Sequence, residues 1–451
     1  MPTLLVIWIA KISAWMSRAL GRGEASALPG LIAERLQPDI LELLGRQLGD
    51  GSILITGTNG KTTTTRMAAA VMEANGQKPL VNRGGSNLTR GLVSTLIGAC
   101  DWQGKVTADL GVFEVDEAAF PAAFRVLKPK AIVILNLFRD QLDRYGELNT
   151  LADKLKQALR GTNSQVVLNA DDPLVTWLGN DLRNVHYFGL ESANVSKLDH
   201  DFAADSNACP VCGRKLVYDQ LFYAHVGIYH CSEKHFARPN PNVVGNTTKA
   251  TLSESKTSVK AGSARVDLNL ELPGLYNVYN ALAATTLAKS LGCGLQSSIE
   301  AIETVPAAFG RAEIITINGR KVQIFLVKNP TGFNQVIQAY RSEPESKPTL
   351  ILVNDLIADG RDVSWLWDVA FEDMPTGAPI VSGGTRAYDL ALRLKYAKTN
   401  SFIELDYSQA IDWLLDQIPK GSGGIILPTY TAMLAIRREL AKRIDMIRID
   451  A

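Results

Sequence analysis

The chain has 451 residues, 46% of them hydrophobic, and a formal net charge of +1 at pH 7. This length predicts two or three globular domains, and the near-neutral charge gives no electrostatic basis for binding nucleic acid. Five cysteines in so long a chain do not suggest a disulfide framework, and they indicate a reducing compartment. We therefore expect a cytoplasmic globular protein.

An apolar segment, MPTLLVIWIAKISAWMSRALGRG, opens the chain, and its apolar run is too short to span a bilayer. Large apolar residues recur along it at helical spacing: Leu5, Trp8, Ile12 and Trp15. Residues 1–49 are therefore expected to form a helical segment. Two interpretations stay open, a helix packed on the core and a helix that contacts a partner or the inner face of the membrane.

The stretch ILITGTNGKTTTTRMAAA joins an apolar run to a turn rich in Gly, Thr and Asn, and then to a helix-forming tail. Gly57 and Gly60 allow backbone angles at which amide groups converge on an anion. A helix that begins near Lys61 would add its positive N-terminal end. Lys61 would then reach the outer phosphates of a nucleotide, and the Thr62 hydroxyl would ligate Mg²⁺. The spacing G-T-N-G-K-T is shorter than the general phosphate loop, because isoleucine occupies the position of the first glycine.

From residue 50 to about residue 190, short apolar runs alternate with helical patterns, which is typical of a doubly wound α/β sheet. Three runs are expected to be buried parallel strands: LGVFEV (110–115), AIVILNL (131–137) and QVVLNADD (165–172). Acidic or amide residues close these strands: Glu114 and Asp116, Asn136 and Asp140, Asn169 and Asp171. Such folds bind ligands at the carboxyl ends of their strands, so we expect the site there.

Residues 203–243 interrupt this alternation with Cys, His, Tyr and Pro. Cys209, Cys212 and Cys231 are spaced like the two halves of a zinc ribbon. His235 would complete the ligand set, with His230 as the alternative fourth ligand. We expect a structural Zn²⁺ site in a zinc-ribbon-like insertion, and a metal-free remnant is the alternative.

A turn and a long helix are predicted for LPGLYNVYNALAATTLAKSLG, and a second α/β alternation follows VPAAFGRAE. Its strands are expected near VQIFLV (322–327), TLILVND (349–355), PIVSGG (379–384), FIELD (402–406) and GIILPTY (424–430). We place the domain boundary near residues 311–315. The predicted organisation is an N-terminal segment (1–49), a central domain (50–312) and a C-terminal α/β, Rossmann-like domain (313–451).

Six motifs occur in the order found in the Mur ligase superfamily: TGTNGKTT, FEVDE, NLFRDQLDRYGE, VLNADDP, LPGLYNVYNALAA and FGRAE. This resemblance covers about residues 50–315 and implies a Mur ligase-type central domain that binds ATP through the phosphate loop. The superfamily includes the amide ligases of peptidoglycan synthesis and folylpolyglutamate synthase. The family's peptidoglycan enzymes carry an N-terminal domain that holds a uridine nucleotide. Because the loop begins at residue 57, we expect this chain to lack that domain, which would fit a lipid-linked substrate.

The cysteine-rich insertion, LVKNPTGFNQ and NDLIADGRDVSWLWD resemble the MurT family, the ligase subunits of glutamine-hydrolysing lipid II isoglutaminyl synthase. The resemblance implies ATP-dependent amidation of the D-glutamate α-carboxylate of lipid II through an acyl phosphate. The ammonia would come from a GatD-like glutaminase subunit in a heterodimer. The alternatives are another amino-acid ligase, similar to folylpolyglutamate synthase, and an inactive nucleotide-binding scaffold.

For single residues, the resemblance implies the following roles. The expected ATP-binding residues are Gly57, Thr58, Asn59, Gly60, Lys61, Thr62, Thr63, Asn280 and Arg311. Glu114 is expected to bind Mg²⁺ together with Thr62, and the catalytic set is Lys61, Glu114 and Asp355. Gln141 replaces a metal-ligating histidine of relatives, which leaves a second Mg²⁺ site open. Lys154 is the candidate for a carbamylated lysine, with an ordinary surface lysine as the alternative.

Further expectations concern a helix cap, the source of ammonia and the site of the partner subunit. Asn277 fits a helix cap better than a nucleotide contact. Cys293 follows a helix and has no accompanying histidine motif, so this chain is not expected to hydrolyse glutamine by itself. By resemblance, a carboxylate after the strand at 349–355 completes the partner's Cys-His site. Asp355 is the first candidate and Asp359 the second, and a loop capped by aspartate is the structural alternative.

Overall fold

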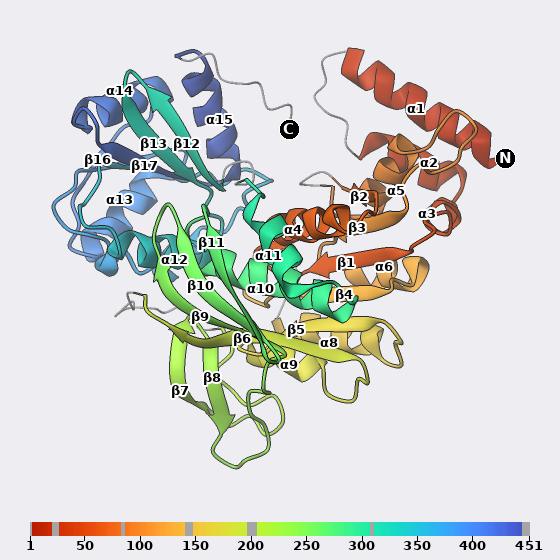
Figure 1. Cartoon of the computed structure of the whole chain (residues 1–451). Coiled ribbons are helices and arrows are strands. Elements are labelled where there is room, and N and C mark those ends of the chain that lie inside the picture. Colours follow the sequence, from red (N-terminus) through yellow and green to blue (C-terminus); the bar gives the residue numbers. More distant parts are fainter. Residues whose placement is uncertain are drawn as a thin grey trace.

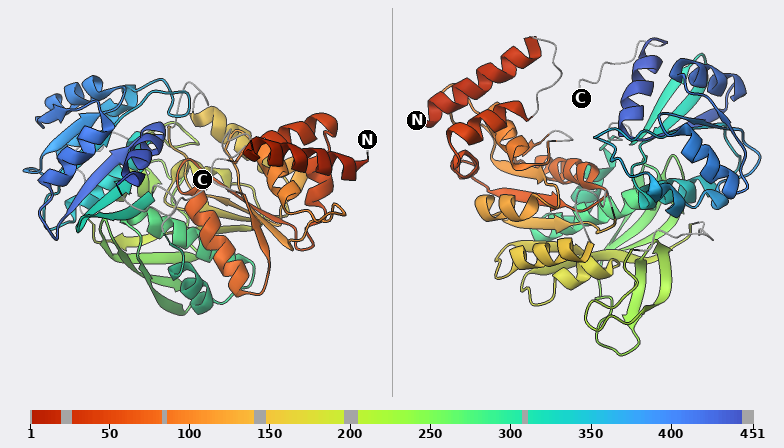
Figure 2. Two further views of the ribbon diagram at one scale, coloured as in Figure 1. Left: turned by 90° about the horizontal axis from the view of Figure 1, so that it is seen from above. Right: turned by 180° about the vertical axis from the view of Figure 1, so that it is seen from behind.

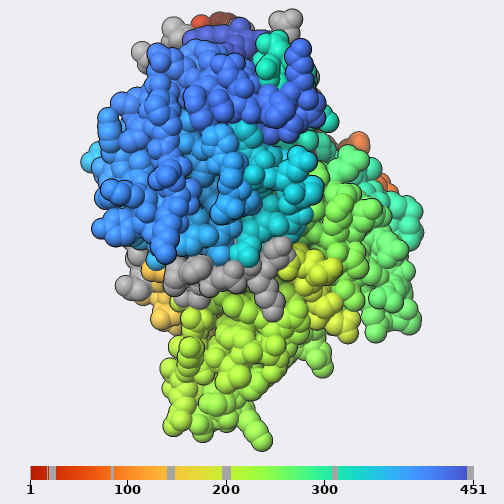
Figure 3. Space-filling view, turned by 90° about the vertical axis from the view of Figure 1, so that its left-hand side faces the viewer, coloured from red at the N-terminus to blue at the C-terminus, as the bar shows by residue number. Residues whose placement is uncertain are grey.

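The computed structural model describes residues 2–19, 27–82, 86–139, 148–195, 205–306 and 311–443. Its two main bodies are each built on one sheet, and a small hairpin projects from the first (Figure 1). The space-filling view shows this hairpin, in yellow-green, as a projection below the C-terminal body (Figure 3).

The first body has a nine-stranded sheet in the order β11-β10-β9-β6-β5-β4-β1-β3-β2. Its strands are β1 (Ser52–Thr56), β2 (Pro79–Val81), β3 (Leu110–Glu114), β4 (Ala131–Ile134), β5 (Gln165–Asn169), β6 (Val185–Ala193), β9 (Val243–Ala250), β10 (Ser255–Ala261) and β11 (Ala264–Leu270). All neighbours pair in parallel except β9–β10 and β10–β11. The three strands predicted between residues 110 and 172 are therefore confirmed.

Helices cover both faces of this sheet. One face carries α4 (Lys61–Ala74), α10 (Gly274–Ser290) and α11 (Leu295–Glu303). The other carries α1 (Thr3–Ala19), α2 (Leu28–Leu36), α3 (Ile40–Gly45), α5 (Thr89–Gly98), α6 (Phe120–Leu127), α8 (Leu148–Leu159) and α9 (Pro173–Leu178). Side chains of a strand alternate between faces: Ile53 and Ile55 pack in the first core, and Leu54 packs in the second.

The C-terminal body has a six-stranded sheet in the order β12-β13-β17-β14-β15-β16. Its strands are β12 (Arg311–Ile317), β13 (Arg320–Phe325), β14 (Thr349–Leu352), β15 (Ile380–Gly383), β16 (Ser401–Ile403) and β17 (Gly423–Pro428). Only β12 runs antiparallel to its neighbour. The five strands predicted in this part of the chain are confirmed.

Helices also cover both faces of the C-terminal sheet. On one face lie α12 (Pro330–Arg341), the short 3₁₀ helices η1 (Ser364–Asp368) and η2 (Phe371–Asp373), and α13 (Ala387–Tyr396). On the other lie α14 (Tyr407–Gln417) and α15 (Tyr430–Ala441). Helix α12 contacts α10 of the first body, so the two bodies meet at the edge where β1 and β4 end.

The hairpin consists of β7 (Leu216–Tyr223) and β8 (Val226–Cys231), paired antiparallel. Its turn lies toward the first body, because Phe222, Tyr223 and Val226 belong to the same core as β1 and α10. Its open end has a small core of its own, which includes Cys209 and Cys231. The hairpin therefore links the two-body junction to the cysteine cluster.

The N-terminal segment is helical, as predicted, and α1 packs on the core, but not through the residues whose spacing suggested the helix. Helix α1 packs through Val6, Ile7 and Ala10, which are buried. The residues singled out by their spacing lie on the exposed side: Leu5, Trp8, Ile12 and Trp15. Within the described ranges, no helix has the length and hydropathy needed to cross a membrane.

Candidate active site

Two glycines shape the turn between β1 and α4. Gly60 has φ +89°, and a Cβ added there would lie 2.1 Å from Oδ1 of Asn280 on α10. Gly57 has φ +131°, and its Cβ would lie 3.0 Å from the backbone of Asn136, which follows β4. Both positions combine a left-handed backbone with close neighbours, so only glycine fits. The turn therefore packs closely between the end of β4 and α10.

The residues after β4 also fix the turn by hydrogen bonds. The Asn59 backbone N–H donates to Asn136 Oδ1 (2.8 Å), and Asn136 Nδ2 donates back to the Asn59 carbonyl (3.0 Å). The Thr58 N–H donates to the Asn136 carbonyl (3.0 Å), and the Phe138 N–H donates to the Thr58 hydroxyl (2.9 Å). This reciprocal pairing holds the loop at the carboxyl edge of the sheet, where the strand pattern predicted a site.

Lys61 is buried at the start of α4 and bends back over the turn. Its Nζ donates to the Gly57 carbonyl (2.6 Å) and to Oε2 of Glu117 (3.0 Å). Burial lowers the pKa of Lys61, but the carboxylates of Glu117, Glu114 and Asp116 outweigh it, and the net shift is upward. Burial raises the pKa of Glu117, but Lys61 holds it below its ordinary value. Both groups are therefore ionised at neutral pH.

Thr62 and Glu114 meet next to this ion pair. The Thr62 hydroxyl donates to Glu114 Oε2 (2.6 Å), because β1 and β3 pair with Ile55 opposite Glu114. Asn82 holds the Glu114 backbone from the other side, accepting from its N–H (2.8 Å) and donating to its carbonyl (2.9 Å). A hydroxyl and a carboxylate are hard oxygen ligands of the kind that Mg²⁺ prefers. The residues present therefore fit the predicted metal site.

The described part of the loop at 82–91 borders the same acids. Asn82 holds Glu114, and the Asp116 N–H donates to the Asn87 carbonyl (2.9 Å). Residues 83–85 lie outside the described ranges. The described residues place this loop at the edge of the candidate metal site.

Asn280 and Asn277 lie in the first turns of α10. Asn280 contacts Gly60 and donates to Asn277 Oδ1 (3.1 Å), so it borders the phosphate loop. The prediction that Asn277 caps the helix is wrong: α10 begins at Gly274, and the Asn277 amide donates to the Pro273 carbonyl (2.8 Å). It acts as a donor inside the first turn, where a cap would accept from the backbone.

Three other predicted residues lie at the limits of the described structure or away from the loop. Gln141 lies outside the described residues. The backbone of Arg311 begins β12, and its side chain is not described. Lys154 is exposed on α8, as expected for an ordinary surface lysine.

A cavity at the junction of the two bodies opens beside the phosphate loop. The first body contributes Asn59, Gly60, Thr63, Phe138, Tyr223, Tyr279 and Asn280, and the second contributes Phe325, Lys328 and Gln335. Asn329, which caps α12, donates to Oδ1 of Asn59 (3.1 Å) and so ties the C-terminal body to the loop. Burial raises the pKa of Tyr223 and Tyr279 well above the ordinary value, so both stay neutral. The cavity can hold an aromatic ring next to bound phosphates.

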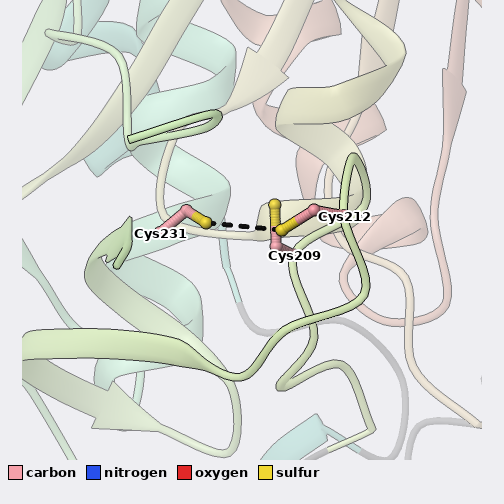
Figure 4. A group of neighbouring side chains, drawn as sticks. All are labelled: Cys209, Cys212 and Cys231. Carbon is pink, nitrogen blue, oxygen red and sulfur yellow. Dashed lines mark hydrogen bonds between the residues drawn. The ribbon is translucent and has the colours of Figure 1, made fainter. Parts of the chain in front are cut away.

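Three cysteines gather at the open end of the hairpin (Figure 4). The sulfur atoms of Cys209, Cys212 and Cys231 all lie within 4.8 Å of one another, and the last two are 3.6 Å apart. Zn–S bonds of about 2.3 Å place the sulfurs of a tetrahedral site about 3.8 Å apart. The three cysteines therefore fit a zinc site.

Neither candidate for the fourth zinc ligand joins this group. Among the described residues, no histidine has a ring nitrogen within 4.8 Å of all three sulfurs. His235 is exposed, and His230 Nδ1 lies 3.4 Å from Asp219 Oδ2. The structure thus brings together three members of the predicted set, without the fourth.

The two candidate aspartates after β14 differ in environment. Asp355 is half-buried, accepts from the Thr385 hydroxyl (2.9 Å) and lies 3.0 Å from Arg386 Nε. Asp359 is buried and accepts from the hydroxyl and the N–H (2.8 Å) of Thr431, at the start of α15. Asp355 is thus the one that a partner could reach, and Asp359 stabilises a helix end.

Comparisons with known proteins place the chain in a family. Residues 55–288 match the model of the Mur ligase middle domain, and residues 326–433 match that of the MurT ligase C-terminal region. The chain is 31% identical to subunit MurT of the lipid II isoglutaminyl synthase (glutamine-hydrolyzing) of Staphylococcus aureus (strain COL), over 97% of this chain and 98% of that protein. The chain belongs to the MurT family. It is also 32% identical, over 98% of each chain, to the MurT subunit of Streptococcus pneumoniae R6.

Solved structures show the same fold as this MurT family member. A pseudomurein peptide ligase type C from Methanothermus fervidus superimposes with a TM-score of 0.71 at 24% identity, covering 89% of this chain and 80% of that one. MurF from Acinetobacter baumannii gives a TM-score of 0.66 at 16% identity, covering 92% and 81%. At these identities the likeness shows the Mur ligase fold alone.

Sequence reasoning missed two contacts of this MurT family member's site. The acid that pairs with Lys61 is Glu117, the last residue of FEVDE. This motif contains three acidic residues, and their number could have suggested a partner for the lysine. The contact of Asn329 with Asn59 comes from LVKNPTGFNQ, where Asn-Pro before a helical pattern is a helix-start signal.

Proposed function

We propose that the chain is the ligase subunit of a lipid II isoglutaminyl synthase. In this reaction ATP phosphorylates the D-glutamate α-carboxylate of lipid II, and ammonia displaces phosphate from the acyl phosphate to form D-isoglutamine. The observation that carries the proposal is that the Lys61–Glu117 and Thr62–Glu114 contacts occur in a chain similar to MurT subunits along nearly its whole length.

Lys61 and the phosphate loop have the main role in the proposed phosphoryl transfer. The loop presents backbone N–H groups and the N-terminal end of α4, which favour phosphate oxygens. Lys61, held charged by the neighbouring acids, neutralises charge that develops on the transferring group. The geometry supports this because Lys61 already lies over the loop, with Glu117 as its counter-charge.

Thr62 and Glu114 are proposed to hold Mg²⁺, which would supply further charge neutralisation at the phosphates when bound. Thr58, Asn59, Gly60 and Thr63 form the rest of the nucleotide contact in this proposal. Asn280 presses on the loop from α10, and Arg311 is proposed to contact ATP from the hinge before the C-terminal sheet. A second Mg²⁺ would need another ligand in place of the histidine that Gln141 replaces.

The partner is proposed to be a GatD-like glutaminase that docks on the C-terminal body and forms a heterodimer. The relatives are named as subunits of a glutamine-hydrolyzing enzyme, and Cys293, partly buried after α10, has its thiol pKa raised by burial, which opposes thiolate formation. Asp355 is followed by Leu356 and by Ile357, which is 84% exposed. Large exposed apolar residues continue on α13 and near β16: Tyr388, Leu392, Tyr396, Phe402 and Leu405. Such a surface suits a stable protein partner.

Cytoplasmic action at the inner face of the membrane belongs to the same proposal, because the named substrate of the relatives is a lipid. A folylpolyglutamate synthase-like ligase is less well supported, since a solved member of that class shares only the fold, with 13% identity.

The test is to combine the purified chain, a co-purified glutaminase subunit, ATP and lipid II, and to analyse the product by mass spectrometry. Amidation with glutamine supports the proposal; ATP turnover only with an added amino acid favours the other ligase, and no turnover favours the scaffold.

Replacing Glu117 with glutamine is expected to make amidation sensitive to alkaline pH. The buried Lys61 loses its main counter-charge, so its pKa falls and the charged form is lost as pH rises. Above the new pKa, the ratio of variant to wild-type rate should fall about tenfold per pH unit. Ammonia-dependent rates measured between pH 7 and 9 give this ratio, with Glu73→Gln, an exposed acid on α4, as the control. A ratio that stays constant with pH contradicts the assigned role of Glu117.

The zinc site predicts a metal content of about one Zn²⁺ per chain, bound by Cys209, Cys212, Cys231 and a fourth group. Cys209→Ser should lower this content strongly, because thiolates are the principal ligands of structural zinc. Elemental analysis of the purified proteins measures the content, with Cys100→Ser as the control. His235→Ala and His230→Ala then test the fourth ligand, and zinc-free wild-type protein would favour the metal-free remnant.

A further inference from the structure

Helix α1 has two apolar faces, and the described parts of the chain bury only one of them. Val6, Ile7 and Ala10 are buried against the first body. The other face exposes large apolar side chains: Leu4, Leu5, Trp8, Ile12, Trp15 and Met16. Trp15 is 66% exposed, and the positions recur every three or four residues, so they form one continuous stripe. Exposed apolar surface of this kind marks an interaction site.

The loop that holds Trp102 extends this stripe. The indole N–H of Trp8 donates to the Trp102 carbonyl (3.2 Å), and Lys11 Nζ lies 5.9 Å from the centre of the Trp102 ring. Trp102 itself is 80% exposed. We call the exposed face of α1 together with Trp102 the α1–Trp102 surface. It contains three of the seven tryptophans of the chain.

The charged residues that we place beside this surface are mainly positive. Helix α1 contains no acidic residue, and its half-buried Lys11 lies beside the Trp102 ring. Lys105 is exposed in the loop of Trp102. An acid of the same loop, Asp101, accepts from the backbone N–H groups of Gln103 and Lys105, so its carboxylate is engaged within the loop. The surface therefore suits an occupant with an apolar interior and negative charge at its boundary.

We propose that the α1–Trp102 surface docks on an anionic phospholipid membrane, with α1 lying in the plane of the interface. Tryptophan concentrates at the boundary between headgroups and acyl chains, and basic residues beside it are attracted to anionic lipids. Because α1 is fixed to the first body by its buried face, it binds as a preformed element.

The position of α1 is compatible with this role. It lies at the end of the molecule opposite the C-terminal body, where the glutaminase is proposed to dock (Figure 2). Docking on a membrane would thus leave the C-terminal body accessible. The choice of a membrane over a second protein draws support from the proposed lipid-linked substrate, but the surface and its test do not require catalysis.

The test is co-sedimentation of the full chain with vesicles of phosphatidylglycerol and phosphatidylcholine, compared with vesicles of phosphatidylcholine alone. Wild-type protein should bind the anionic vesicles with a blue shift of tryptophan fluorescence. The variant Ile12→Glu/Trp15→Glu should bind at least about tenfold more weakly, because two charges enter the apolar stripe. The control is Leu392→Glu/Phe402→Glu, which alters similarly exposed residues of the C-terminal body and should bind like the wild type.

Circular dichroism and thermal unfolding show whether the α1 variant keeps its fold, and Trp15→Ser provides a milder second variant. Ammonia-dependent amidation of detergent-solubilised lipid II should be unchanged in both, which separates failure of this inference from failure of the proposed function. The proposal is overturned if the wild type does not bind anionic vesicles, or if the variants bind as well as the wild type. It is also overturned if α1 variants instead convert a dimer of the chain into a monomer without affecting vesicle binding.

Discussion

Replacing Lys61 with alanine is expected to abolish amidation, with both glutamine and free ammonia as the nitrogen source. The ammonium of Lys61 lies on the phosphate loop, 2.6 Å from the Gly57 carbonyl, and is kept charged by three acids. Its removal leaves the charge on the transferring phosphoryl group without the cation that the phosphate loop supplies. We expect a rate loss of at least about a thousandfold. Phosphate release from ATP and product mass spectrometry measure the two halves of the reaction.

Lys289→Ala provides a matched control, because Lys289 is an exposed lysine near the end of α10. It should retain wild-type activity. Thermal unfolding of Lys61→Ala is also needed, since the variant leaves Glu117 buried without its partner. If the folded Lys61→Ala protein turned over ATP at the wild-type rate, the assignment of residues 57–62 as a catalytic phosphate loop would be wrong.

The phosphate loop and the strand-end acids could be predicted from the sequence because their signals are local. Glycines before Lys-Thr, at a change from an apolar run to a helical pattern, specify a turn with few alternatives. Parallel strands bring their carboxyl ends to one edge, so Glu114 was expected at the site, and the family resemblance implied that it binds Mg²⁺ together with Thr62. The pairing of Ile55 with Glu114 then supplies the contact itself.

The contacts that sequence reasoning missed depend on packing between distant segments. Glu117 is 56 residues from Lys61, and Asn329 is 270 residues from Asn59. The first contact depends on how the chain turns after β3, and the second on how the two bodies pack. Neither leaves a periodic pattern in the sequence. The cysteines gathered as their spacing predicted, but neither His235 nor His230 joins them.

Helix α1 shows another limit of periodicity. Its sequence carries apolar residues on nearly every side, and a helical period identifies faces without showing which one the core takes. Val6, Ile7 and Ala10 are small or branched and pack closely on the neighbouring helices, and the bulkier tryptophans remain outside. Tertiary packing determines which face of α1 is buried.

Replacing Asp355 with asparagine is expected to separate the two nitrogen sources. If the Asp355 carboxylate orients a histidine of the glutaminase, the nearly isosteric amide removes its charge and its second acceptor. Glutamine-dependent amidation should fall about a hundredfold or more, and ammonia-dependent amidation should persist. The fold should tolerate the change, because the pair of Asp355 with Arg386 is partly exposed and such pairs contribute about 1 kcal/mol or less. Both rates are measured in the complex with the partner subunit.

Two neighbouring aspartates make this experiment specific. Asp389→Asn removes the other carboxylate near Arg386, at 3.4 Å, so it tests whether release of Arg386 alone affects the complex, and it should keep both activities. Asp359→Asn weakens the start of α15 and should lower stability and both rates together. A joint loss of both rates in Asp355→Asn would assign Asp355 to the ligase reaction or to folding. Unchanged rates would remove Asp355 from the partner's site, because the carboxylate that the glutaminase needs would then come from elsewhere.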